Sequence, residues 1–243
     1  MLNLPNILRE TPYPGRGIAL GITPDGMQAV IVYFIMGRSE NSRNRVFIPT
    51  EDGIRTQAFD EGKLTDPSLI IYHPIRTVNG QTIVTNGDQT DTIYKHLDSP
   101  RPATANVIAQ HAVSAFAAAL RTRTFEPDAP HYTSRISGLL QADGRAVLSI
   151  LKTADGETCR RFFYEYEPRA GLGHFIHTYQ ADKEPLPPFE GEPRPIAIKQ
   201  DVNAFAGEIW QSLNTENKVA LFVRSVHLES EEQETRIYNR HDN

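Results

Sequence analysis

Two Asp-Gly turns divide residues 135–166, RISGLLQADGRAVLSILKTADGETCRRFFYEY, into three largely apolar segments. Asp143-Gly144 and Asp155-Gly156 supply the positive φ angles that tight hairpins need. The stretch therefore predicts three antiparallel strands over Arg135–Gln141, Arg145–Lys152 and Glu157–Tyr166. It decides the fold class, because short hairpin turns join antiparallel strands and cannot join parallel ones.

The same turn signals occur on both sides of this segment. Pro24-Asp25-Gly26, Asp52-Gly53 and Asn79-Gly80 each separate two runs of strand-forming residues. The other strands that we expect are Gly17–Thr23, Gln28–Met36, Val46–Pro49, Ile54–Phe59, Leu69–Val78, Gln81–Thr85, His174–Tyr179, Val219–Val226 and Arg236–Asn239. Gln28–Met36 is apolar at almost every position, which is typical of a strand that is buried on both faces.

Helices are fewer and lie between the strands. Ala105–Leu120 and Val202–Leu213 place apolar residues at helical spacing, with Thr104 and Asp201 as the expected N-caps. A third, short helix is expected after Asn86-Gly87-Asp88. This order predicts an α+β fold in which helices pack on the faces of antiparallel sheets.

Length and charge narrow the class of protein. The 243 residues can bury a large core, and we expect one domain over residues 1–243, with the helix and strands of 201–243 packed on it. Glu184–Pro195 is Pro-rich and acidic, and it is expected to be a long loop rather than a linker. Thirty acidic residues against 25 basic ones give a net charge of −5, which argues against nonspecific nucleic-acid binding.

Cysteine content and hydropathy narrow the class further. Cys159 is the only cysteine, so the chain can form no internal disulfide and no zinc site built on cysteines. No apolar run approaches the ~20 residues of a membrane span, and the first residues lack the basic start and apolar core of a secretory signal. The sequence therefore predicts a cytoplasmic protein without a membrane segment.

The densest polar segment is Gly37–Arg45, GRSENSRNR, directly after an apolar strand. Its three arginines carry planar guanidinium groups that suit phosphate oxygens, and they form a local positive site on an acidic protein. A solvated hairpin loop has a similar composition, so the segment by itself leaves both interpretations open.

Two further segments also have a structural and a functional interpretation. Thr85–Ile93 enters a helix whose N-terminus could bind an anion, but Asp88 and Asp91 could equally cap that helix. Tyr72 lies in an apolar run, as core tyrosines do, whereas a tyrosine facing a cleft could exchange a proton. The sequence has no Walker loop, G-x-G-x-x-G, G-x-S-x-G or H-E-x-x-H, which argues against the common nucleotide-hydrolysing, dehydrogenase and esterase classes.

Taken in order, these motifs form a pattern. The pattern consists of Pro14-Gly15-Arg16-Gly17, Gly37–Arg45, Ile71-Tyr72 with Ile75-Arg76, Thr85–Ile93, and Arg135-Ile136. It resembles the archaeal-type inosine monophosphate (IMP) cyclohydrolase family, over roughly Tyr13–Tyr179. The tail from Asp201 onward is similar to bacterial-type members of that family.

The resemblance implies a four-layer αββα sandwich of antiparallel sheets, as in the N-terminal nucleophile hydrolases. Enzymes of that wider fold use an N-terminal Cys, Ser or Thr, whereas this chain begins Met1-Leu2. The cyclohydrolases share the scaffold without that nucleophile, so the departure favours them over amide hydrolases. Fold alone does not determine function.

The resemblance also implies a reaction, the last step of de novo purine synthesis. The carboxamide nitrogen of 5-formamidoimidazole-4-carboxamide ribotide (the formamido ribotide) attacks its own formyl carbon, and water leaves to give IMP. No cofactor and no metal is expected, and the expected partners are the purine ribonucleotide and further copies of the chain in a homo-oligomer. Because both reacting groups belong to one substrate, the protein must bind its phosphate, stabilise charge on the formyl oxygen and move protons.

The matched motifs predict the site residues. Tyr72 is predicted to transfer a proton, Asn86 to bind the carboxamide or formyl oxygen, and Arg38 to share phosphate binding and oxyanion stabilisation with Arg43 and Arg45. The other predicted substrate-binding residues are Arg16, Ser39, Asn41, Asp91, Glu126 and Arg135. Asp91 is expected to orient an arginine or hold the ribose, Arg135 to contact an anion, and Glu126 with Asp128 to be candidate general acids.

Two other functions stay open from the sequence. An amide hydrolase on the same scaffold would need a nucleophile exposed by processing of the chain. A purine ribonucleotide-binding protein without catalysis would keep the phosphate site and lose turnover.

Overall fold

The computed structural model describes residues 1–64, 66, 67, 69–99 and 105–242, and the side chains of these apart from 105–110. Its first sheet has the strand order β11-β10-β1-β2-β12-β13, and every neighbouring pair is antiparallel. These strands are β1 (Arg16–Ile22), β2 (Gln28–Met36), β10 (Leu172–His177), β11 (Arg194–Ala197), β12 (Lys218–His227) and β13 (Gln233–Asn239). The C-terminal segment therefore supplies a central strand, because β12 pairs with β2 along its whole length.

The second sheet follows the chain order from β3 to β9 and is also antiparallel. Its strands are β3 (Arg45–Pro49), β4 (Gly53–Ala58), β5 (Ile75–Val78), β6 (Gln81–Thr85), β7 (Arg135–Leu140), β8 (Ala146–Lys152) and β9 (Arg160–Tyr166). The helices are α1 (Leu4–Glu10), α2 (Glu40–Arg43), α3 (Gln89–Leu97), α4 (Ala105–Arg121) and α5 (Val202–Ser212), with a short 3₁₀ turn at Glu61–Lys63. The predicted α+β class with antiparallel sheets is confirmed.

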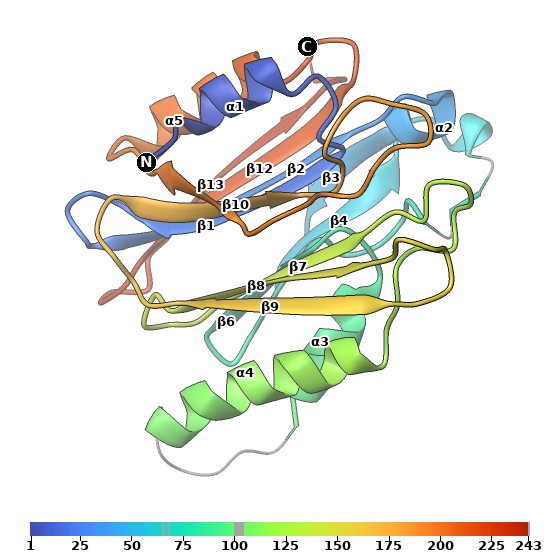
Figure 1. Ribbon diagram of the computed structural model, residues 1–243. Coiled ribbons are helices and arrows are strands. Elements are labelled where there is room, and N and C mark those ends of the chain that lie inside the picture. Colours follow the sequence, from blue (N-terminus) through green and yellow to red (C-terminus); the bar gives the residue numbers. More distant parts are fainter. Residues whose placement is uncertain (65, 68, 100–104, 243) are drawn as a thin grey trace.

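Three clusters of buried apolar side chains hold these elements together. Side chains of α1 and α5 pack on one face of the first sheet, and the two sheets share a second cluster between them. Side chains of α3 and α4 pack on the far face of the second sheet. Figure 1 shows β2 in the first sheet, between the layer of α1 and α5 and the second sheet. Val32 and Phe34 belong to the cluster with the helices, whereas Ile31 and Tyr33 belong to the cluster between the sheets, which explains why β2 is apolar throughout.

Most predicted elements occur within three residues of their expected bounds, and the strands Gln28–Met36 and Gln81–Thr85 match at both ends. The expected N-cap Asp201 is confirmed, because its carboxylate accepts a hydrogen bond from Ala204 N at 2.9 Å. The other expected cap, Thr104, lies outside the described residues.

The predicted strand Leu69–Val78 is wrong in its first part, because only Ile75–Val78 is a strand. Pro74 has no N–H to donate to a ladder, which ends the strand on that side. The preceding segment is instead held by Thr56 of β4, whose hydroxyl hydrogen-bonds with Ile70 O at 2.7 Å and accepts from Tyr72 N at 2.9 Å.

Four short elements were not predicted: α1, α2, the 3₁₀ turn and β11. The helix α1 has seven residues, too few to show a helical period, yet Leu4, Ile7 and Leu8 are all buried. Its start is capped by the side chain of Asn3, which accepts from Asn6 N at 3.0 Å. Elements of this length depend on tertiary packing more than on their own sequence pattern.

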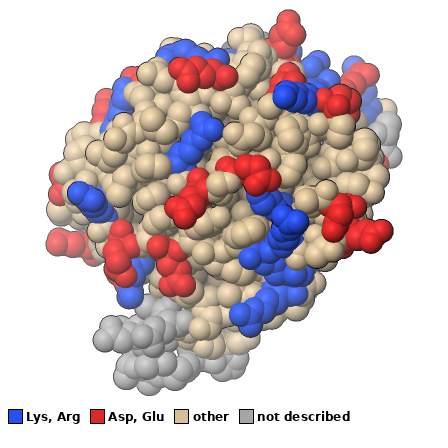
Figure 2. All heavy atoms as spheres, viewed as in Figure 1, with Lys and Arg blue, Asp and Glu red and all other residues tan. Residues whose placement is uncertain are grey.

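The surface carries charges of both signs. On the face drawn in Figure 2, some Lys and Arg form a band at the lower right, with Asp and Glu on either side of it, and other charges of both signs are scattered over the rest. None of the helices in the described part of the chain is both long and apolar enough to cross a membrane.

His177, at the end of β10, makes the stability of the fold depend on pH. Its ring is fully buried beside Phe175 and Phe189, and its Nδ1 donates to Tyr179 O at 2.9 Å. Burial, helped by the positive charge of Arg194, lowers the pKa of His177 to about 3. Below pH ~6.5 the unfolded chain therefore takes up a proton that the folded chain does not, and folding loses free energy as the pH falls.

We expect His177→Gln to remove this dependence. Between pH 7 and pH 5 the wild type should lose about 2 kcal/mol more unfolding free energy than the variant, since each pH unit is worth ~1.4 kcal/mol. Urea denaturation of both proteins at the two pH values measures the difference. Equal losses in the two proteins would show that His177 is not the titrating group.

Candidate active site

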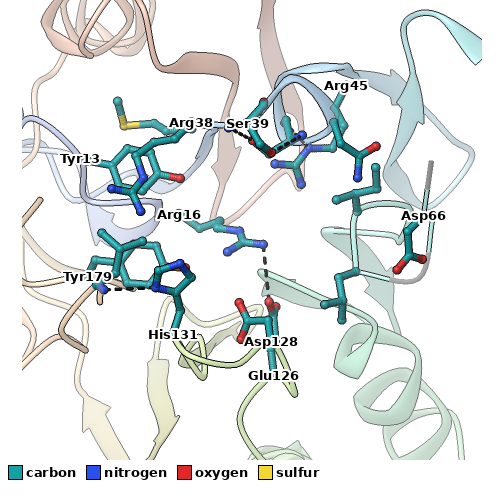
Figure 3. Close-up of a pocket in the computed structure, with 16 residues that line it drawn as sticks. Tyr13, Arg16, Arg38, Ser39, Arg45, Asp66, Glu126, Asp128, His131 and Tyr179 are labelled. Atoms are coloured by element: carbon teal, nitrogen blue, oxygen red, sulfur yellow. Dashed lines mark hydrogen bonds and ion pairs between the residues drawn. The ribbon is translucent and has the colours of Figure 1, made fainter. Parts of the chain in front are cut away.

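A cavity of about 300 Å³ lies at the end of the two sheets where β1 and β3 begin and β2 ends (Figure 3). Its walls come from these strand ends, from α2, from the segment before β7 and from the segment after β10. The residues that line it are Tyr13, Arg16, Met36, Arg38, Ser39, Asn41, Ser42, Arg45, Asp66, Leu69, Ile70, Glu126, Asp128, His131, Tyr179 and Leu186.

Arg16 crosses the middle of this cavity (Figure 3). Its backbone is fixed by a hydrogen bond from Arg16 N to Thr178 Oγ1 at 3.1 Å. The preceding Gly15 has a φ of +75°, and a Cβ there would stand 2.2 Å from Thr178 Oγ1, so only glycine fits. The Arg16 side chain is largely buried, and its guanidinium forms an ion pair with the Glu126 carboxylate at 3.6 Å.

Arg45 approaches the cavity from β3 and is only 1% exposed. Its Nε donates to Ser42 O at 2.8 Å. Among the residues that the structure describes, Nη1 has no hydrogen-bond partner and the guanidinium forms no ion pair with a carboxylate. Burial lowers the pKa of Arg45, yet a guanidinium stays charged in proteins. A buried cation in this state is stabilised when an anion enters the cavity.

The short helix α2 places the polar residues between Arg38 and Arg45. Ser42 N donates to Ser39 Oγ and Ser39 N donates to Ser42 Oγ, both at 3.1 Å, which forms a capping box. This turn explains why the polar segment after β2 is ordered rather than a solvated hairpin. It also occupies both serine hydroxyls, although both residues line the cavity.

Arg38 lies at the more exposed side of the cavity. Its guanidinium sits over the ring of Tyr13, 5.1 Å from the ring centre, and Tyr13 stacks on Tyr179 with 5.7 Å between ring centres. Its two terminal nitrogens each pair with a carboxylate at 3.1 Å, one from Asp182 and one from Glu184.

Glu126 supplies a buried carboxyl below Arg16 (Figure 3). Burial raises the pKa of this carboxyl above its usual range, and the positive charges of Arg16, Arg135 and Arg45 only partly offset the rise. A raised pKa favours the protonated form of the carboxyl, which is the form that a general acid needs.

Asp128 and Tyr179, which both line the cavity, are joined through the buried hydroxyl of Thr133. Asp128 accepts from Thr133 N at 2.6 Å and also from the Thr133 hydroxyl. That hydroxyl is 2.6 Å from the Tyr179 hydroxyl, and burial raises the pKa of Tyr179 to about 12. The chain of groups ties a phenol to a carboxylate across the floor of the cavity.

The structure brings together six of the eleven residues predicted from the sequence as catalytic or substrate-binding. Arg16, Arg38, Ser39, Asn41, Arg45 and Glu126 line the cavity, and so does the further candidate acid Asp128. The other five are Arg43, Tyr72, Asn86, Asp91 and Arg135, which do not line it.

Four of these five have hydrogen-bond or ion-pair partners that do not line the cavity. Arg43 donates to Gly37 O at 2.8 Å and to Asn217 Oδ1 at 3.1 Å. The Asn86 amide is fully buried, donates to Ser134 O and accepts from Ile136 N.

Asp91 pairs with Arg76 of β5 at 3.0 Å. Arg135 donates to Gln89 Oε1 at 2.6 Å and pairs with Asp88 at 2.8 Å. Arg135 is still close enough to Glu126 to lower the pKa of that carboxyl, so it acts on the cavity through its charge.

Tyr72 is buried, and its hydroxyl is 2.8 Å from the hydroxyl of Tyr33. It lies near enough to Arg16 and Arg45 to influence the pKa of both guanidinium groups. Its predicted part in proton transfer stays a prediction.

Sequence reasoning missed several lining residues. They are Tyr13, Met36, Ser42, Asp66, Leu69, Ile70, His131, Tyr179 and Leu186. Tyr13 and Tyr179 mark the two ends of the resemblance, but no local motif singles them out. They meet because β1 and β10 pair, with Gly17 opposite His177.

The cavity thus combines three guanidinium groups with carboxyl groups on its floor, which suits an anionic ligand that undergoes proton transfer. The sequence model of the IMP cyclohydrolase-like protein family matches residues 13–231. The chain belongs to this family. The matched range contains every residue that lines the cavity, and it extends through α5 and β12. Among curated proteins, no sequence gives a significant match to the chain.

Proposed function

We propose that the chain is an IMP cyclohydrolase, which closes the ring of the formamido ribotide to give IMP and water. One observation carries the proposal: Arg16, Arg45 and the Glu126 carboxyl converge on a single cavity in a chain of this family. The guanidinium groups suit an anionic substrate and a developing oxyanion, and the carboxyl suits a general acid.

The chemistry needs two proton transfers. When the carboxamide nitrogen bonds to the formyl carbon, that nitrogen loses one proton and the formyl oxygen becomes a hydroxyl. When the hydroxyl leaves as water, it takes a second proton, and the former formamido nitrogen loses one. A carboxyl that starts protonated can donate to the oxygen, accept from the nitrogen and end as it began.

We assign these steps to the residues of the cavity. Glu126 donates to the formyl oxygen, because its raised pKa keeps the proton available. Arg45 stabilises the oxygen as charge develops, and the Arg16 guanidinium, 3.6 Å from the Glu126 carboxyl, stabilises the carboxylate that forms when Glu126 gives up its proton. Arg38, at the mouth, binds the 5′-phosphate.

We also propose the finer parts of the fold and setting. The layered arrangement corresponds to the αββα scaffold of the N-terminal nucleophile hydrolases, here without the nucleophile. A single domain, a homo-oligomer and a cytoplasmic location remain predictions from the sequence.

A cyclisation assay without added metal tests the function, with IMP formation followed by absorbance. We expect turnover above the uncatalysed rate and its loss in Arg38→Ala through weaker substrate binding. Tight binding of IMP without turnover would instead indicate a ribonucleotide-binding protein. The absence of both turnover and binding would rule out this ligand.

Tyr72→Phe tests the proton-transfer prediction. If the hydroxyl moves a proton, we expect kcat to fall by about 10²-fold, the lower end of the range for acid–base catalysis. Tyr33→Phe is the matched control, because it removes the same hydroxyl–hydroxyl hydrogen bond from the other side. Equal effects of the two substitutions would indicate that the hydrogen bond matters only for packing.

A further inference from the structure

The connection between β10 and β11 borders the cavity, because its Leu186 lines the cavity and its Asp182 pairs with the lining residue Arg38. Its base is fixed: Gln180 N donates to Pro187 O at 2.9 Å, and Lys152 Nζ donates to Phe189 O at 2.7 Å. Residues 182–185, which are all exposed, form the part that we call the acidic tip. Leu186, directly after the tip, is buried and lines the cavity.

The acidic tip places two carboxylates on one guanidinium. Asp182 Oδ1 is 3.1 Å from Arg38 Nη1, and Glu184 Oε2 is 3.1 Å from Arg38 Nη2. The other Glu184 oxygen is 3.4 Å from His131 Nε2, and His131 Nδ1 accepts from Leu186 N at 3.2 Å. Two oxygens that face the two terminal nitrogens of an arginine reproduce the contacts of a phosphate group with that arginine.

The two ion pairs of Arg38 are weak because all three side chains are partly exposed to solvent. The side chain of Arg38 is 33% exposed, that of Asp182 38% and that of Glu184 65%, so water and salt screen both pairs. Arg38 itself is held in place from below by the Tyr13 ring, independently of the carboxylates. A dianion that enters the cavity can therefore replace the two carboxylates as the partner of the Arg38 guanidinium, and the guanidinium does not have to move.

We propose that Asp182 and Glu184 form an autoinhibitory contact, in which they occupy Arg38 until a phosphate monoester dianion displaces them. Any anion must compete with two carboxylates that are tethered beside the guanidinium, so the acidic tip lowers the affinity of Arg38 for anions. The proposal rests on the proposed function in one respect, because the dianion is taken to be the 5′-phosphate of a purine ribotide.

Calorimetric binding of IMP, and of inosine as the ligand without phosphate, tests this inference. In Asp182→Asn/Glu184→Gln we expect IMP to bind about 3- to 10-fold more tightly, the range for two exposed ion pairs, and inosine to be unaffected. Glu192→Gln/Glu229→Gln is the matched control, because it removes two exposed carboxylates that do not pair with Arg38. This control should leave IMP affinity unchanged.

A double-mutant cycle assigns the effect to Arg38. In an Arg38→Met background, the two tip substitutions should no longer strengthen IMP binding. Unchanged or weaker IMP binding in the tip variant, or a gain that persists without Arg38, would overturn the inference. So would the failure of the wild type and the variant to bind either IMP or inorganic phosphate.

The outcomes separate this inference from the proposed function, since turnover is measured independently. Tighter IMP binding in the tip variant with no turnover in any protein would retain the role of the tip and reject the cyclohydrolase. Turnover in the wild type with no gain in IMP affinity in the variant would support the cyclohydrolase and reject the role of the tip.

Discussion

Glu126→Gln is expected to lower turnover of the formamido ribotide by about 10²- to 10⁴-fold, the range for a general acid. The amide has nearly the same shape as the carboxyl, and its oxygen can still face the Arg16 guanidinium. It cannot donate and then recover a proton as both steps of ring closure require. Steady-state measurement of kcat and KM should show the loss mainly in kcat, because the interaction lost is made in the transition state.

The pH profile provides a second test of the same residue. Burial raises the pKa of Glu126, and the catalytically competent form is the protonated one. Wild-type kcat should therefore be constant below this raised pKa and fall as the pH rises through it. The residual activity of Glu126→Gln should lack that decline. Full turnover in the variant, or an unchanged alkaline decline, would remove Glu126 from the proton-transfer step.

A folding control separates chemistry from structure. The substitution leaves Arg16 without its carboxylate partner, which could weaken the fold as well as the site. IMP affinity and the urea midpoint of Glu126→Gln should therefore be measured alongside turnover. A variant that binds IMP and unfolds near the wild-type midpoint assigns the loss to chemistry.

The fold was predictable from the sequence where local chemistry decides the structure. Asp143-Gly144 and Asp155-Gly156 specify hairpins by their backbone preferences, and β7 and β8 follow closely from them. Tyr72 shows the limit of this reasoning. Its apolar neighbours suggest a strand, but a hydrogen bond from Tyr72 N to Thr56, sixteen positions away, decides the conformation there.

Part of the candidate site was predictable from the sequence. Arg38 and Arg45 belong to a single polar segment, which suggested a cationic site, and the family resemblance favoured that interpretation over a solvated loop. Tyr179 and His131 reach the cavity through the pairing of distant strands and through the segment before β7. The residues next to Tyr179 and His131 in the sequence do not predict that these side chains line the cavity, because their positions depend on long-range packing.

The position of the acidic loop was also not predictable from the sequence. Glu184–Pro195 has the composition of a linker or loop, and the sequence does not reveal its position. The structure shows that Glu184 pairs with Arg38, about 150 positions earlier in the chain, and that β11 begins at Arg194. Composition therefore predicted the type of segment correctly, whereas its functional meaning comes from the ion pairs at the cavity mouth.

Arg45→Met is expected to change stability and activity in opposite directions. The guanidinium is almost completely buried, and in the described part of the chain its Nη1 has no hydrogen-bond partner. Replacing a whole buried ion pair by apolar side chains is often neutral or stabilising by about 1–4 kcal/mol, and the same relief of desolvation is expected for a buried guanidinium that pairs with no carboxylate in the described part of the chain. For a chain of this size, each kcal/mol corresponds to a Tm shift of about 2–4 °C, so calorimetry should show an unchanged or higher Tm.

The same substitution should lower kcat by about 10²- to 10³-fold, the cost of losing one donor to a developing oxyanion. Arg43→Met is the matched comparison from the same segment, because the Arg43 guanidinium already donates to Gly37 O and Asn217 Oδ1. Its loss should lower Tm, the opposite of the effect at Arg45. A lower Tm in Arg45→Met with unchanged turnover would mean that Arg45 serves the fold and that the cavity does not use its charge. A stable but inactive Arg45→Met protein would mean that the chain keeps an uncompensated buried cation for the sake of its ligand.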